Sequence, residues 1–143
     1  MPVKIENQEK AIAALNQALA WELRASAMYA HYAAYVKGLE SLTLEELFKE
    51  EAEESFGHAE KVRNIIADLG GEAVTQRDPT PIVHTENVKT MLEEALKTEQ
   101  KAAAQYGEIV PLVKSYYPHF HTVIHIQKDE MDAVIEFDKL LGR

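Results

Sequence analysis

Two glutamates occur in stretches that otherwise have the composition of a buried helix face. Glu22 lies in "ALAWELRASAMYAHY" and Glu99 lies in "LKTEQKAAAQY". Each is followed seven positions later by a tyrosine, Tyr29 or Tyr106. An ionised carboxylate among apolar side chains is costly unless it is paired with a cation or hydrogen-bonded. The repeated placement therefore indicates a specific partner for both carboxylates.

A third glutamate and one histidine share this apolar setting. Glu130 lies in "IQKDEMDAVIEF" and His58 lies in "ESFGHAEKVRNII". Several carboxylates that approach one volume cannot all stay ionised without a cation, so some protonate or a metal ion binds. Carboxylates with imidazole suit iron, manganese or zinc. Cysteine is absent, which excludes thiolate ligands and disulfides.

The elements that must position these residues are all helical. Glycines and prolines cluster at a few breaks, and no stretch shows sustained strand alternation. Pro111 should kink or split the third helix, whereas Pro118 fits the first turn of the fourth. The link over 70–84 is long enough to cross the length of a bundle. The expected helices span 6–37, 43–69, 85–115 and 118–141.

Within each helix, apolar residues recur at spacings of three and four, which gives one apolar stripe with a polar centre. No lysine or arginine occupies a stripe. Such stripes pack as a left-handed four-helix bundle, so we expect an all-α fold in a single domain over 1–143. The first and second halves resemble a duplicated helical hairpin, which would bring the four polar centres to one level.

Composition narrows the classes of partner. The chain has 143 residues and a formal net charge of −9, which argues against nucleic acid as a partner. No apolar run approaches the length of a membrane span. The N-terminal "MPVKIENQEK" lacks the apolar region of a secretory signal, so we expect a cytoplasmic protein.

The chain resembles the ferritin-like superfamily, nearest to bacterioferritins and rubrerythrin-type domains. The resemblance covers about 6–141 and is carried by "WELRASAMY", "HAEKVRNIIADLGG", "MLEEALKTEQKAAAQY" and "DEMDAVIEFDKLL". It implies a bundle with a long connection between helices two and three. It also implies a di-iron site built from one glutamate on each of two helices and a Glu-x-x-His on each of the others. A homo-oligomer is implied too, with weak support from the aromatic stretches "MYAHYAAYV" and "SYYPHF".

The resemblance assigns the six family ligand positions to Glu22, Ser55, His58, Glu99, Glu130 and Ala133. Serine and alanine stand where a glutamate and a histidine are expected, so four family ligands remain. Glu22, His58 and Glu130 would form the nearly complete half of the site, and it should bind metal more tightly.

Two alternatives concern the missing ligands. Glu51 or Glu54 could compensate for them. A shift of one residue in the fourth helix would instead offer Asp129 and Asp132, but it would place Glu136 rather than Phe137 on the core, which disfavours it.

We therefore expect an iron-handling protein that holds one or two iron ions and oxidises ferrous iron with oxygen or peroxide. Zinc or manganese could occupy the same ligands. The alternative is a non-catalytic scaffold with a mononuclear or lost metal site. Tyr29 and Tyr106 should hydrogen-bond the central carboxylates as second-layer residues. Phe56 stands where bacterioferritins carry a haem-ligating methionine, so no haem is expected.

Four further histidines lie outside these stripe centres. His121 and His125 have the four-residue spacing of a metal chelate, although a role at a surface or subunit contact is the favoured interpretation. His31 and His84 have no partner at a useful spacing and are interpreted as surface residues.

Overall fold

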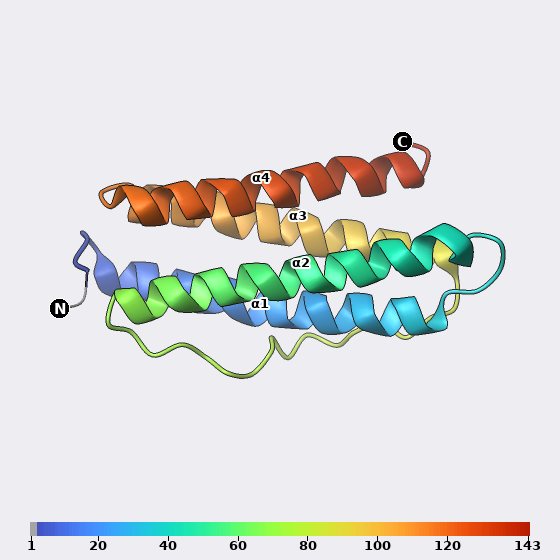
Figure 1. Ribbon diagram of the computed structural model, residues 1–143, viewed down its shortest axis with the longest axis horizontal. Helices are drawn as coiled ribbons and strands as arrows, with labels where there is room; N and C mark the ends of the chain where they lie inside the picture. Colours follow the sequence, from blue (N-terminus) through green and yellow to red (C-terminus); the bar gives the residue numbers. More distant parts are fainter. Residues whose placement is uncertain (1–2) are drawn as a thin grey trace.

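The computed structural model describes residues 3–143. Within that range the chain forms four helices and no strand, as the sequence predicted (Figure 1). None of these helices is long and apolar enough to cross a membrane. The helices are α1 (Gln8–Tyr35), α2 (Ser41–Asp68), α3 (Val88–Val113) and α4 (Tyr117–Leu140).

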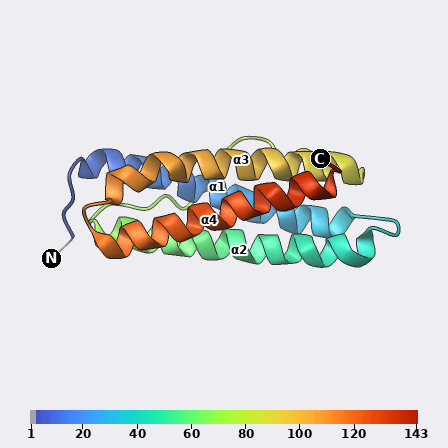
Figure 2. The same cartoon turned by 90° about the horizontal axis from the view of Figure 1, so that it is seen from above.

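The bundle consists of two antiparallel hairpins, α1 with α2 and α3 with α4. The crossover segment, residues 69–87, starts at the end of α2 and runs back along the bundle before α3 begins (Figures 1 and 2). Its length allows α3 to start at the opposite end of the molecule from the end of α2. As a consequence, α1 and α3 run in opposite directions, and the long connection expected from the sequence is confirmed.

Local sequence explains where the helices end. Gly70 adopts a positive φ of 80° after α2, and its N–H donates to the Ala67 carbonyl, which gives a glycine-terminated helix end. Asn87 caps α3 by accepting a hydrogen bond from the Thr90 N–H. Pro111 does not split α3, because it lies in the last turn and the helix continues to Val113.

Three side chains of α1 hold the crossover segment against the bundle: Asn16, Arg24 and Tyr32. Their hydrogen bonds reach main-chain groups of Glu72, Val74, Thr80, Pro81 and Val83. Tyr32 is consequently buried, and Tyr35 is the tyrosine of "MYAHYAAYV" that reaches solvent. This stretch therefore gives little of the support for a subunit contact that we expected from it.

The apolar core is divided into two clusters along the bundle axis. One contains Leu19, Ile66 and Val113, and the other contains Phe48 and Phe137. The polar centres of the four stripes lie between them. This arrangement excludes water from the centre and leaves the polar groups there to find partners among themselves.

Candidate metal centre

Each helix contributes at least one buried ionisable side chain to the middle of the bundle. Glu22 comes from α1, His58 from α2, Glu99 from α3 and Glu130 from α4. All four are at most 3% exposed. The sequence placed these four residues at one level, and the structure brings them together there.

His58 pairs with two of the three carboxylates through one ring nitrogen. Its Nδ1 is 2.7 Å from Glu130 Oε1 and 3.0 Å from Glu22 Oε2. Burial opposes the charged ring, but the hydrogen bonds to Glu130 and Glu22 outweigh it and raise the pKa of His58 to about 11. In the metal-free protein, an imidazolium therefore compensates the buried negative charge.

The other ring nitrogen of His58 faces a second, outer pair of carboxylates. Its Nε2 is 3.0 Å from Asp129 Oδ2 and 3.7 Å from Glu54 Oε1. Both carboxylates are partly exposed, with about two fifths of each side chain in solvent. The sequence offers Asp129 as a ligand only in a shifted register, whereas in the structure it contacts His58 while Glu130 faces the core.

The predicted register of α4 is confirmed. Glu130, Ala133 and Phe137 are buried, and Asp132 points outward to an ion pair with Lys128. Asp129 reaches His58 from the edge of the same helix because it directly precedes Glu130. The one sequence signal that could have identified Asp129 is its position directly before Glu130, a carboxylate on the core face of the helix.

Two tyrosine hydroxyls also donate hydrogen bonds to carboxylates of the centre. Tyr29 donates to Glu99 Oε1 at 2.6 Å, and Tyr106 donates to Glu22 Oε2 at 3.0 Å. These are the hydrogen bonds that the stripes led us to expect. They fix Glu22 and Glu99 from opposite sides of the centre.

The pKa values of the three carboxyl groups of the centre are raised above their ordinary values. Burial is the largest cause for all of them, followed by neighbouring charges or hydrogen bonds among the groups of the centre. The pKa of Glu130 rises to about 7, and those of Glu22 and Glu99 also rise. The centre therefore holds protons at a pH at which exposed carboxyls would be ionised.

The second half of the family site is incomplete in the structure as well. Ser55 and Ala133 are both buried at the level of the centre. Glu51 is also buried, and desolvation followed by repulsion from Glu99 raises its pKa to about 8. Among the described residues, the groups of converging ligand atoms do not include Glu51 or Glu99.

The geometry of the first half fits a metal ion. Ligand atoms of Glu22, His58 and Glu130 lie within 4.8 Å of one another. Glu22 Oε1 is buried without a hydrogen-bond partner. A buried, unpartnered carboxylate oxygen beside a second carboxylate and an imidazole matches the ligand preference of a divalent transition-metal ion. A second converging group, Glu54, His58 and Asp129, adjoins it on the outer side.

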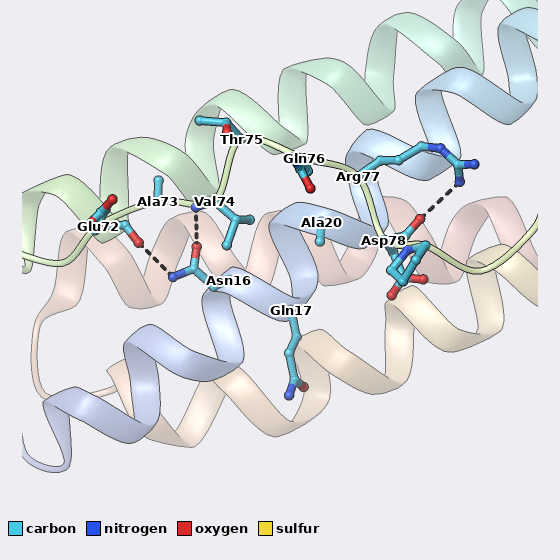
Figure 3. Close-up of a pocket in the computed structure, with 11 residues that line it drawn as sticks. Asn16, Gln17, Ala20, Glu72, Ala73, Val74, Thr75, Gln76, Arg77 and Asp78 are labelled. Atoms are coloured by element: carbon cyan, nitrogen blue, oxygen red, sulfur yellow. Dashed lines mark hydrogen bonds between the residues drawn. The ribbon is translucent and has the colours of Figure 1, made fainter.

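A large open groove lies elsewhere on the molecule. It has a volume of about 670 Å³ and runs between α1 and the first part of the crossover segment (Figure 3). Asn16 spans it through hydrogen bonds to the main chain of Glu72 and Val74 (Figure 3). None of the residues that line it belongs to the carboxylate–histidine centre, so we do not assign the centre's chemistry to this groove.

Comparison with known proteins found structures with a similar fold. A ferritin-like di-iron carboxylate protein from Bacillus anthracis superposes with a TM-score of 0.90 at 28% identity, covering 96% of this chain and 99% of that one. Two further structures share the fold. The dodecameric thioferritin of Bacteroides fragilis, a bacterioferritin-related protein, has a TM-score of 0.87 at 24% identity. The match covers 95% of this chain and 86% of that one. The Desulfovibrio desulfuricans bacterioferritin has a TM-score of 0.84 at 23% identity, and the match covers 94% of this chain and 80% of that one.

The comparison with curated proteins found no significant match. The family model described as the ferritin-like domain matches residues 12–143, which is nearly the whole chain. This chain belongs to the ferritin-like domain family.

Proposed function

We propose that this protein binds iron in the bundle core and oxidises ferrous iron there, with oxygen or hydrogen peroxide as the electron acceptor. The observation that carries the proposal is the convergence of ligand atoms from Glu22, His58 and Glu130 in the bundle core, where Glu22 Oε1 is buried without a hydrogen-bond partner. Membership of the ferritin-like family supports it, as does the 28% identity to a di-iron carboxylate protein. Two ferrous ions would each give up one electron, and these two electrons with two protons would reduce oxygen to hydrogen peroxide, or hydrogen peroxide to two water molecules.

The residues of the centre have distinct tasks in this proposal. Glu22 and Glu130 supply anionic oxygen ligands, and His58 supplies Nδ1 after its proton has left. The Nε2–H of His58 donates to Asp129, which holds the ring in place and keeps Nδ1 free for the metal. Glu99 is a further ligand contributed by α3. Tyr106 and Tyr29 orient Glu22 and Glu99.

A second candidate function follows from the incomplete half of the centre. Ser55 and Ala133 offer a second ion neither a carboxylate nor an imidazole. The protein would then hold one redox-inert ion, such as zinc, or serve as a scaffold without metal. The single converging triad in the core, among the described residues, is the observation that favours this candidate.

We also propose that the chain forms a homo-oligomer. The thioferritin of Bacteroides fragilis, which shares the fold, is dodecameric. Light scattering at micromolar concentration would test this, and a monomeric mass would contradict it.

The decisive experiment is iron titration of metal-free protein without oxygen, followed by exposure to oxygen. We expect bound ferrous iron to be retained on the protein and then oxidised over repeated additions. Glu130→Gln should lose this activity, whereas His84→Ala, a surface variant, should keep it. Binding of one ion with no oxygen-dependent turnover, or no binding at all, would contradict the first proposal and support the second candidate.

A further inference from the structure

Two histidines on the exposed face of α4 point the same ring nitrogen at each other. His121 Nε2 and His125 Nε2 are 3.1 Å apart, and the ring centroids are 4.3 Å apart. Their spacing of four residues places both on one face of the helix. Both side chains are exposed, so the pair is open to solvent. Neither residue contributes to the carboxylate–histidine centre.

The separation of the two nitrogens suits chelation. Two nitrogens that each lie 2.0–2.1 Å from one metal ion, at an angle between 90° and tetrahedral, are about 2.9–3.4 Å apart. The observed 3.1 Å falls inside this range. In the metal-free pair, the two rings share a hydrogen bond through the same nitrogens. A metal ion can therefore replace the shared proton with little movement of either ring.

The other histidine pair of the molecule shows what a structural role looks like. His31 Nε2 and His84 Nδ1 are 2.8 Å apart, so these residues do have partners, contrary to the sequence interpretation. This contact ties the crossover segment to α1, and the ring of Tyr35 packs against both imidazoles. His121 and His125, by contrast, lie on neighbouring turns of one helix and join no two elements.

We propose that His121 and His125 form a surface site for one divalent transition-metal ion of the Zn²⁺, Co²⁺ or Fe²⁺ class, with water completing its coordination. Imidazole nitrogen suits these ions. The formal net charge of −9 raises the local concentration of cations around the protein.

The position of the pair suggests what the site does. Asp129 lies one further turn along the stripe that carries His121 and His125, and its carboxylate contacts His58 Nε2. The stripe thus leads from the exposed pair to the outer edge of the core centre, where Glu54 also lies. The pair is therefore the outer step of a supply route to the core, a role that rests on the proposed function.

Zn²⁺ titration of the metal-free chain, followed by calorimetry, tests the site. We expect two classes of site in the unmodified protein. His121→Ala and His125→Ala should each weaken the surface class by about tenfold or more and leave the core class intact. His58→Ala should weaken the core class alone, and the matched control His84→Ala should change neither. Both surface positions are exposed, so circular dichroism should show folded variants. Isotherms of His121→Ala and His125→Ala that match the unmodified protein would overturn the proposal.

The supply role needs a kinetic measurement. Stopped-flow absorbance of Co²⁺ should show slower filling of the core in His121→Ala and His125→Ala, with the same final occupancy. Unchanged filling rates would overturn the supply role. A core that takes up no Co²⁺ would contradict the proposed function, whereas the surface site would still be scored by the Zn²⁺ titration.

Discussion

The Tyr29 hydroxyl donates a hydrogen bond of 2.6 Å to Glu99, a residue on another helix. The relation is reciprocal, because Tyr106 on the helix of Glu99 donates to Glu22 on the helix of Tyr29. The two helices run in opposite directions, so a tyrosine seven residues after each glutamate lies opposite the glutamate of the other helix. This geometry explains why the chain repeats the same Glu–Tyr spacing.

The two tyrosines should contribute similar amounts to stability. Tyr29→Phe and Tyr106→Phe each remove one donor to a buried carboxyl group, so we expect each to lower the free energy of unfolding by about 1–2 kcal/mol. Urea unfolding of metal-free protein measures this. Tyr35→Phe is the matched control, since Tyr35 is partly exposed and lies outside the centre. Equal stability of all three variants would show that the hydroxyls contribute nothing.

His58 should be indispensable for metal binding in the core. His58→Ala removes the only nitrogen ligand of the core triad and leaves Glu22 and Glu130 without their counter-charge. We expect the affinity of the core for ferrous iron or Zn²⁺ to fall by about tenfold or more. Calorimetry measures the affinity, with His84→Ala as the control. Core affinity that survives the substitution would place the ion elsewhere.

The incomplete half of the centre should be restorable. Ser55→Glu with Ala133→His reinstates the two missing ligand types at buried positions facing the centre. We expect the double variant to bind two ions per chain and to oxidise ferrous iron faster than the unmodified protein. Ala133→His alone is the control for the added side-chain volume. Two equally occupied ions in an iron-soaked structure of the unmodified protein would show that Glu51, Glu54 or Asp129 already supplies the missing ligands.

The metal-free protein should lose stability as the pH rises. The pKa values of Glu130 and Glu51 are raised to about 7 and about 8 by burial and neighbouring charges, so the folded state holds protons that the unfolded state releases near pH 4.5. Stability therefore falls from about pH 5 to pH 8. His58, with its pKa raised to about 11, acts in the same direction, because its contribution is complete below pH 6.5 and lost towards pH 11.

Thermal unfolding between pH 5 and pH 9 in the presence of a chelator measures this slope. Glu51→Gln should flatten it, because it removes one of the titrating groups. Bound metal should reverse it, because the ligands bind metal in their deprotonated forms. A melting temperature that stays level or rises with pH in metal-free protein would contradict the prediction.

The sequence by itself determined the fold and the inward face of each helix. A spacing of three and four fixes which side of a helix is apolar, and this rule correctly placed Glu22, Glu99 and Glu130 together with His58 at the bundle centre. The end of the second helix followed from the glycines after Leu69, whereas the third helix begins at Val88, after its Asn87 cap, rather than at 85 as expected. These features depend on interactions within a few residues, and such interactions are visible in the order of the chain.

Only the tertiary structure decided which carboxylates each ring nitrogen of His58 contacts. It also decided that His31 contacts His84. The ring rotation of His58 depends on Asp129, seventy-one positions away along the chain, and on the angle between two helices. The sequence of the crossover segment shows no periodic pattern that would predict its path. Its main chain is instead held by single side chains of α1, such as Arg24. Contacts between distant, non-repeating segments are set by packing of the whole bundle, and no local pattern encodes them.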